Sequence, residues 1–116
     1  MESMVFSCGL DVALSVIGGK WKPLILYHLA HGTRRYGELK RAVGGVSDKM
    51  LIQQLKELEK DGIVTRTLYP QVPPRVEYAL SYMGMALGPS IEALIDWAFL
   101  RKEAQGEPLA AEQPAL

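Results

Sequence analysis

The sequence predicts a mainly helical α+β domain that carries a single β-hairpin. Its 116 residues suffice for one hydrophobic core. Apolar residues recur at helical spacing up to Lys60, alternate with polar residues between Ile63 and Leu80, and then return to helical spacing. We expect the domain to span residues 1–104. Residues 105–116 mix Pro, Gly and Ala without periodicity, so we expect a disordered tail there.

The first three helices are predicted from apolar segments that end at glycines. Residues 10–17, LDVALSVI, precede a double glycine that stops a helix. The segment KWKPLILYHLAHG, residues 20–32, predicts the second helix, with Pro23 suited to its first turn and its leucines on a buried face. In TRRYGELKRAVGG, residues 33–45, we expect a short third helix with Gly37 as its N-cap.

The fourth predicted helix runs from about Ser47 to Lys60. At about 100° per residue, its leucines share one face, which we expect to pack on the core: Leu51, Leu55 and Leu58. Polar residues occupy the opposite face: Lys49, Gln53, Lys56 and Lys60. Such a basic face is either simply solvated or a binding surface, and the rest of the chain decides between the two.

The hairpin and the last helix follow. Residues 63–69, IVTRTLY, and 75–80, RVEYAL, alternate apolar and polar side chains and predict two strands. The segment PQVPP between them, residues 70–74, is too long for a two-residue turn and forms the tip of the hairpin. Ser81 can cap one last long helix, which a Gly-Pro pair at positions 88–89 should kink or break.

Three helices followed by a β-hairpin describe a winged helix, which is a variant of the helix-turn-helix. In this arrangement the fourth helix is the recognition helix, whose first turns meet base edges in the major groove of DNA. Glutamine can bond adenine in both directions, lysine reaches guanine or phosphate, and methionine can contact the thymine methyl group. The residues in these turns that suit such contacts are Ser47, Lys49, Met50, Gln53 and Gln54.

The distribution of charge also favours a polyanionic partner. The net charge is zero, yet eleven of the 13 Lys and Arg residues lie between Lys20 and Arg75, where only five acidic residues occur. The middle of the chain therefore carries +6 and the two flanks together carry −6. One basic face can then meet a nucleic acid. Chance clustering on a solvated surface is the alternative.

Composition excludes several other classes of protein. No run of about 18 apolar residues occurs, so we expect no membrane span. The first residues, MESMVFSCGLDV, have no basic segment followed by a long apolar one, so we expect no signal peptide there. A single cysteine excludes an internal disulfide framework and fits the reducing cytoplasm, where we expect the protein to act. The spacing of His28, His31 and Cys8 does not match a metal site, so we expect none.

Four parts of the chain resemble the HxlR-type family of bacterial winged-helix (MarR-like) transcriptional regulators. They are IGGKWKPLIL (17–26), SDKMLIQQLKELEKDGIVTR (47–66), PPRVEYALS (73–81) and Trp97. The resemblance implies a homodimeric DNA-binding regulator, more often a repressor, whose first and last helices build the dimer interface. It implies neither an enzyme nor a cofactor. The recognition helix would enter the major groove of the operator, and the wing would touch the adjacent backbone or minor groove.

Carried over residue by residue, the resemblance places the start of the recognition helix on residues 47–54 and the wing on residues 69–78. Arg75 becomes the wing arginine, which can reach phosphate or a narrow minor groove. The start of the second helix, with its lysines, suits a phosphate. The full predicted DNA-binding set is Lys20, Lys22, Arg35, Ser47, Lys49, Met50, Gln53, Gln54, Lys56, Arg66 and Arg75.

Cys8 is the candidate sensing residue. In the family that the chain resembles, a cysteine at this place often senses oxidants or electrophiles, by disulfide formation or by alkylation. At the start of a helix, backbone N–H groups and the helix dipole stabilise a thiolate. Two alternatives stay open for Cys8: a buried small hydrophobe in the dimer interface, or no role in sensing because a non-covalent ligand at that interface is the effector. A winged helix used for protein–protein contact alone is the competing function.

Overall fold

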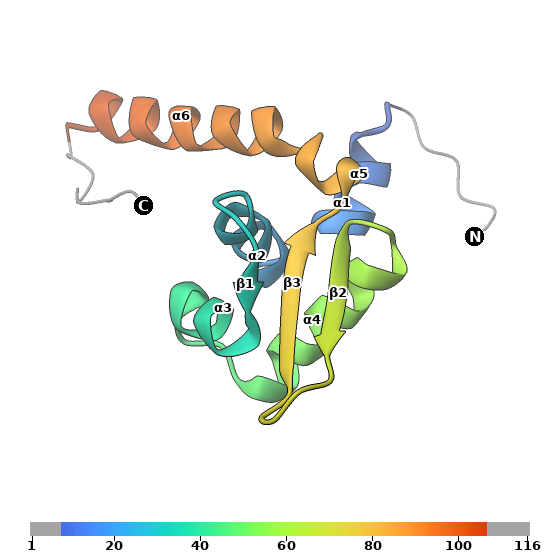
Figure 1. Ribbon diagram of the computed structural model, residues 1–116. Helices are drawn as coiled ribbons and strands as arrows, with labels where there is room; N and C mark the ends of the chain where they lie inside the picture. Colours follow the sequence, from blue (N-terminus) through green and yellow to red (C-terminus); the bar gives the residue numbers. More distant parts are fainter. Residues whose placement is uncertain (1–7, 107–116) are drawn as a thin grey trace.

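The computed structural model describes residues 8–106 and has a winged helix-turn-helix fold (Figure 1), which confirms the predicted α+β class. The elements, in chain order, are α1 (Leu10–Ile17), α2 (Trp21–Leu29), β1 (Arg34–Arg35), α3 (Tyr36–Val43), α4 (Asp48–Lys60), β2 (Val64–Tyr69), β3 (Arg75–Leu80), α5 (Tyr82–Met85) and α6 (Gly88–Ala104). Residues 1–7 and 107–116 lie outside the described part of the chain, and with them most of the predicted tail.

The core lies between helices α2, α3 and α4 and the inner face of the sheet. Its largest fully buried side chains are Ile25, Leu26, Leu39, Leu51, Leu55, Leu58 and Val64. Three of these are the leucines predicted to form the inner face of α4, and each is at most 1% exposed. Burying such side chains stabilises a domain by roughly 1.5–3 kcal/mol each. Because the leucine face of α4 packs on this core, the opposite face of the helix is turned toward solvent.

The sheet has the order β1-β3-β2, and all its pairs are antiparallel. The predicted hairpin is confirmed, with a register that runs from Val64 opposite Leu80 to Tyr69 opposite Arg75. Strand β1 was not predicted: its two residues pair with Tyr78 and Glu77 of β3. A two-residue strand has no periodicity in the sequence, because its pairing is dictated by the strand beside it.

The predicted start of the third helix is wrong. Arg35, not Gly37, is the N-cap of α3, with an extended backbone at φ −73° and ψ 158°. The carboxylate of Glu38 accepts a hydrogen bond from the Arg35 backbone N–H at 2.9 Å. This bond satisfies a backbone donor at the helix start, which places the boundary two residues earlier than expected.

The chain after Ser81 forms two helices, α5 and α6, because the predicted last helix is broken. The Ser81 hydroxyl accepts a hydrogen bond from the Gly84 N–H at 3.1 Å and so caps α5. The break lies directly before the Gly-Pro pair, as predicted, and α6 begins at Gly88. Gly84 is buried against Ile63, whose carbonyl oxygen would lie 2.3 Å from an added Cβ, so only glycine fits this crossing.

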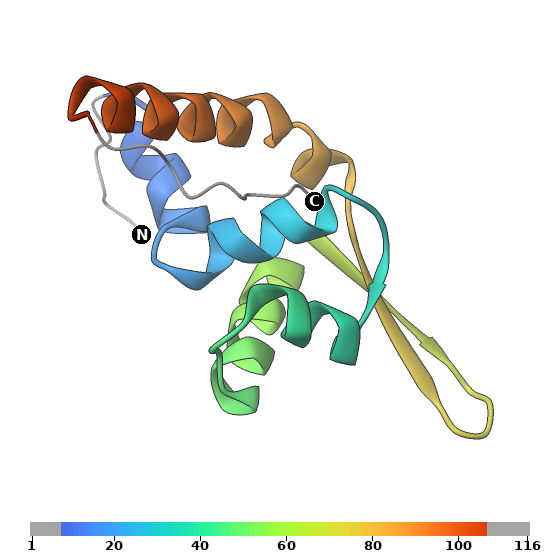
Figure 2. The same ribbon diagram turned by 90° about the vertical axis from the view of Figure 1, so that its left-hand side faces the viewer.

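Helix α6 projects from the rest of the domain (Figures 1 and 2). Its 17 residues make it about 26 Å long. Neither α6 nor α1 contains a buried residue. The radius of gyration is 16.0 Å, larger than the value of about 13 Å for a compact domain of 100 residues. The packing of one chain therefore leaves both helices, α1 and α6, without a buried side chain.

Candidate nucleic-acid interface

The start of α4 and the tip of the wing lie at the same end of the molecule, opposite α6 (Figures 1 and 2). Ser47 caps α4 from an extended backbone, and its hydroxyl accepts a hydrogen bond from the Met50 N–H at 3.1 Å. The predicted polar face is confirmed as solvent-exposed: Lys49, Gln53, Lys56 and Lys60 are all exposed. This end presents the helix and the wing together, which is how a winged helix meets a duplex.

The five residues predicted to meet base edges are not equally accessible. Lys49 and Gln53 are exposed along the outer face of α4. Met50 and Gln54 are half-buried, and Met50 packs against the core. The Ser47 hydroxyl is already used by the helix cap. The structure therefore leaves Lys49 and Gln53 as the most available of the set.

A polar clamp fixes the start of α4 against α3. The Tyr36 hydroxyl donates a hydrogen bond to Asp48 Oδ1 at 2.5 Å, and Lys40 Nζ lies 3.2 Å from the same oxygen. Burial, and then the bond to the Asp48 carboxylate, raise the pKa of Tyr36 to about 12. The bonds from Tyr36 and then Lys40 lower the pKa of Asp48. Asp48 and Tyr36 were not predicted, because the clamp joins residues that are twelve positions apart.

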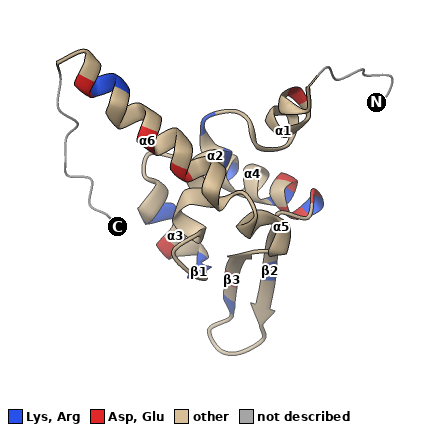
Figure 3. Cartoon of the chain, turned by 90° about the horizontal axis from the view of Figure 1, so that it is seen from above, with Lys and Arg blue, Asp and Glu red and all other residues tan. Residues whose placement is uncertain are grey.

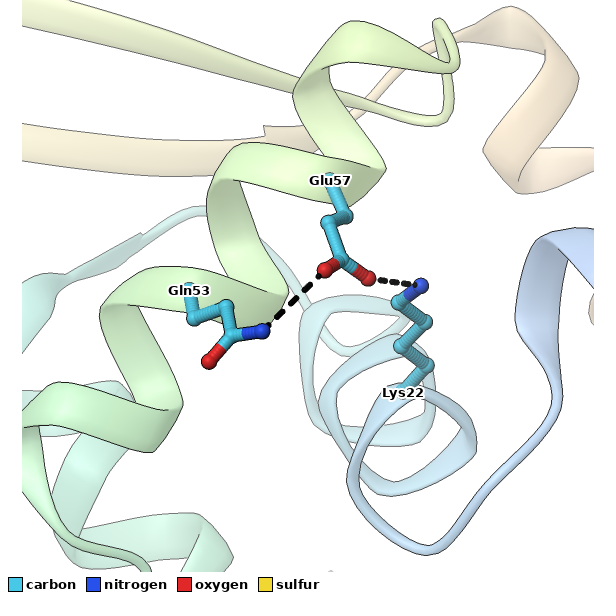
Figure 4. A network of polar contacts seen from close by, with 3 residues as sticks. All are labelled: Lys22, Gln53 and Glu57. Carbon is cyan, nitrogen blue, oxygen red and sulfur yellow. Dashed lines mark hydrogen bonds and ion pairs between the residues drawn. The ribbon is translucent and has the colours of Figure 1, made fainter.

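A second polar network joins α4 to α2 (Figure 4). Lys22 Nζ lies 2.5 Å from Glu57 Oε1, and Glu57 Oε2 accepts a hydrogen bond from Gln53 Nε2 at 3.4 Å. The hydrogen bond from Lys22, and then the one from Gln53, lower the pKa of Glu57. An ionised Glu57 therefore links the buried Lys22 of α2 to Gln53 on the outer face of α4.

The predicted phosphate contact of Lys22 is corrected by this network. Lys22 is 8% exposed, and its ammonium group is occupied by Glu57. Lys20 differs from it: Lys20 is exposed, with its Nζ 4.6 Å from the centroid of the Trp21 ring. Of the two lysines at the start of α2, only Lys20 is exposed to solvent.

The wing holds its arginine firmly. The Arg75 guanidinium stacks 4.2 Å from the centroid of the Tyr69 ring. Its Nε lies 3.1 Å from Glu77 Oε2, an ion pair without the alignment of a hydrogen bond. The side chain is 26% exposed. Arg75 is therefore pre-positioned at the base of the hairpin tip, whereas Arg66 on β2 is exposed.

The fold also brings predicted basic residues together in two hollows. One, of about 450 Å³, lies between α4 and the wing and contains both Lys56 and Arg66; its lining is completed by Tyr36, Ile52, Glu59, Val76 and Tyr78. The other, of about 410 Å³, lies between the start of α3 and the hairpin tip and contains both Arg35 and Arg75. Four of the predicted basic residues thus gather in two pairs beside the wing.

The opposite end of the molecule carries acidic residues. Seen from above (Figure 3), an acidic segment marks α1, and α6 carries both acidic and basic segments, the basic ones being Arg101 and Lys102. Asp11 lies on α1, and Glu92, Asp96 and Glu103 lie on α6. The acidic flanks of the sequence are thus only partly gathered at this end, because Glu77 lies on the wing strand β3 and Arg101 and Lys102 lie on α6.

Cys8 is exposed, immediately before Gly9, which caps α1 with φ 80°.

In the described residues 8–106, His, Cys, Asp and Glu do not gather in a group of three that could hold a metal ion. His28 is half-buried, and burial and the charge of Arg34 lower its pKa. Within the same residues, every helix is too short or too polar to cross a membrane.

Known proteins share both the sequence and the fold. Residues 16–105 match the family described as HxlR-like helix-turn-helix. The uncharacterized HTH-type transcriptional regulator YkvN of Bacillus subtilis (strain 168) is 49% identical over 105 residues, which cover 88% of this chain and 89% of YkvN. Relatives of this kind are transcriptional regulators and not enzymes.

Two solved structures extend the comparison. The redox regulator HypR in its oxidized form is 44% identical, with a TM-score of 0.74 over 78% of this chain and 93% of HypR. The reduced form of the transcriptional regulator YodB from B. subtilis is 34% identical, with a TM-score of 0.70 over 81% of this chain and 92% of YodB.

Proposed function

Because this chain belongs to the HxlR family of helix-turn-helix transcriptional regulators, we propose that it is a sequence-specific, homodimeric repressor that responds to oxidants or electrophiles through Cys8. The observation that carries the DNA-binding part is the division of α4 into two faces. Its leucines are at most 1% exposed, while Lys49 and Gln53 are exposed on the other side. A face so polar and basic suits base edges and phosphates better than a protein partner.

In the proposed complex, the first turns of α4 lie in the major groove. Lys49 and Gln53 read base edges, and Ser47, Met50 and Gln54 line the approach. Residues around this helix bind the phosphate backbone and set the register without reading sequence: Lys20, Arg35, Lys56, Arg66 and Arg75. A protein that acts on the chromosome in this way works in the cytoplasm.

The exposed apolar side chains of α1 and α6 support the homodimer. Leu10 and Leu14 on α1 are 60% and 56% exposed, and Leu94, Trp97 and Leu100 on α6 are 63%, 58% and 62% exposed. Monomeric proteins rarely leave so many large apolar side chains together in water. A second copy related by a two-fold axis would cover both helices and place two α4 helices on one face of the DNA.

Cys8 is supported as the sensor by its position. Its thiol is exposed at the start of α1, one of the two helices assigned to the dimer interface. HypR is named as a redox regulator and is known in oxidized and reduced forms. Alkylation of Cys8, or a disulfide with Cys8 of the second copy in the presence of a peroxide, would shift the two subunits against each other. A coupling of about 1–3 kcal/mol would suffice to regulate DNA binding.

A non-covalent effector is the second candidate, and a cavity favours it. A hollow of about 420 Å³ lies between α2 and α5–α6, with apolar walls from Leu26, Ile91 and Ile95 and polar groups from His31 and Glu92. A small amphipathic molecule in this place would couple the projecting helix to the DNA-binding part.

The test uses the purified chain and the DNA upstream of its own gene. Binding is measured by fluorescence anisotropy at about 50 and 200 mM salt, against random DNA, with and without a small quinone. We expect salt-sensitive binding that prefers the upstream DNA and is altered by the quinone in the parent but not in Cys8→Ser. An equal response of the serine variant would move the effector site to the α2–α6 hollow. Binding to neither DNA at either salt would contradict the regulator itself.

A further inference from the structure

We infer that Glu57 and Lys22 are positioning residues that fix the side-chain amide of Gln53 and thereby select the base that Gln53 reads. The inference rests on the proposed DNA binding by α4. It goes beyond that proposal because it assigns a role in specificity to two residues that do not face the DNA.

The geometry is a relay from the inside of the molecule to its surface (Figure 4). Lys22 on α2 is 8% exposed and lies 2.5 Å from Glu57 Oε1. Glu57 uses its other oxygen, Oε2, to accept from Gln53 Nε2 at 3.4 Å. Gln53 and Glu57 are four residues apart, which places them as neighbours on consecutive turns of α4.

The charge of Glu57 decides which way the Gln53 amide faces. An ionised carboxylate can only accept hydrogen bonds, so the group that faces it must be the NH₂ of the glutamine. The buried ammonium group of Lys22 keeps Glu57 ionised, in line with its lowered pKa. The amide oxygen, Oε1, is therefore directed away from Glu57, as Figure 4 shows.

An outward oxygen has a defined preference among bases. It accepts from the amino group of adenine or cytosine, and the remaining Nε2 hydrogen can donate to N7 of adenine. Guanine offers only the acceptors O6 and N7 at the same edge, so it could accept from the remaining Nε2 hydrogen but would leave the outward Oε1 without a donor. The relay thus favours adenine over guanine at the position that Gln53 contacts.

The alternative is that the Lys22–Glu57 pair only holds α2 against α4. A purely structural pair would change thermal stability and affinity for all DNA in parallel. A positioning pair changes the preference among bases at one position. The two roles are therefore separated by a base-preference profile.

The experiment begins with an operator selected from random DNA by the parent protein. Affinity is then measured for this operator and for all its single base-pair variants, with thermal unfolding as the check on folding. The variants are Gln53→Ala, Glu57→Gln and Lys22→Met. Glu59→Gln is the matched control, because it removes the same charge from the same helix at an exposed residue without a bond to Gln53.

We expect the parent to discriminate about fivefold to a hundredfold at the base pair that Gln53 reads, as one bidentate contact allows. Gln53→Ala should abolish this preference. Glu57→Gln should reduce it by about threefold or more at the same base pair, because its neutral amide no longer dictates the orientation of Gln53. Lys22→Met should act in the same direction, and Glu59→Gln should leave the profile unchanged.

Two results would overturn the inference while leaving DNA binding intact. One is a folded Glu57→Gln variant with the parent profile at the base pair that Gln53→Ala relaxes. The other is a parent that binds specifically while Gln53→Ala relaxes no base pair. If the parent selects no sequence at all, the proposed function fails together with the inference.

Discussion

The two ends of the molecule treat apolar side chains in opposite ways. At the end that holds α4, the three core leucines of that helix are at most 1% exposed, and the opposite face of the helix is largely polar, with Ile52 41% exposed beside it. At the other end, α6 has no buried residue, and its Leu94 and Trp97 are 63% and 58% exposed. One end thus buries its apolar helix face within a single chain and presents charge, and the other leaves large apolar side chains in water. The first suits a polyanion, and the second suits another copy of the chain.

The largest effect should come from placing a charge at the end that holds α6. Leu94→Asp would bury a carboxylate in the proposed dimer interface at a cost of several kcal/mol, which is about a hundredfold or more in the dimer dissociation constant. Analytical ultracentrifugation should find a monomer that binds its operator far more weakly. Leu68→Asp is the matched control for the ultracentrifugation alone, because Leu68 is 53% exposed on the wing, away from α1 and α6. A dimeric Leu94→Asp variant would remove the distinction between the two ends.

At the end that holds α4, removing buried side-chain volume should lower the stability of the fold. Leu55→Ala should lower the free energy of unfolding by about 2–5 kcal/mol, because it leaves a cavity beneath α4. Ile52→Ala, on the same helix but 41% exposed, should cost about 1 kcal/mol or less. Urea denaturation of both variants checks this difference. Equal losses would mean that α4 does not divide into a buried and an exposed face.

Removing the reading side chain should change specificity and leave the fold alone. Gln53→Ala should cost about 1–3 kcal/mol of discrimination between operator and random DNA. Its affinity for random DNA should stay close to that of the parent, because phosphate contacts supply that binding. Competition binding against random DNA measures the ratio. A proportional loss on both kinds of DNA would assign Gln53 to the backbone instead.

Removing a basic residue near the wing should change the salt dependence of DNA binding and leave the sequence preference unchanged. Arg66→Ala should weaken binding several-fold on every sequence and flatten the slope of log affinity against log salt by about one unit. Arg101→Ala, the same change on α6, should leave the slope unaltered. Titrations at four salt concentrations compare the two variants. If both slopes fall equally, DNA contacts extend to the end assigned to the dimer.

The smallest effect concerns the Tyr36–Asp48 clamp. Its bonds lower the pKa of Asp48, so their contribution to stability is present above the pKa of the unfolded carboxyl group and is lost as the pH falls through the lower folded value. The pKa of Tyr36 is raised to about 12, so its contribution is lost only as the pH rises through that value. Tyr36→Phe should therefore cost about 1 kcal/mol or less near pH 7 and lose less stability than the parent in acid. Thermal unfolding between about pH 3 and 7 checks this, and parallel curves would contradict it.

Periodicity predicted the parts of the fold that repeat along the chain. The leucine spacing of α4 and the alternation in both hairpin strands were sufficient, because a regular element buries one face at a regular interval. Strand β1 and the N-cap at Arg35 were missed, since the first depends on β3 and the second on a bond to Glu38. Such features arise from single contacts, which leave no repeat to detect.

The candidate site was predicted less completely than the fold. Lys20 and Lys22 are alike in the sequence, yet only Lys20 faces solvent, because Glu57, 35 residues later, accepts the Lys22 ammonium group. The spacing of Gln53 and Glu57 was a visible helical pair. The contact of this pair with Lys22 depends on how α2 packs against α4, and that packing cannot be read from a single sequence.

The most direct test of both ends together is a hydroxyl-radical and methylation footprint on the selected operator. If two copies join through α1 and α6 and each inserts α4, two major-groove segments on one face of the duplex should be protected. Their centres should lie about one helical turn apart, roughly 10 base pairs, or a whole multiple of it. A single protected segment, or protection without major-groove contacts, would contradict the account.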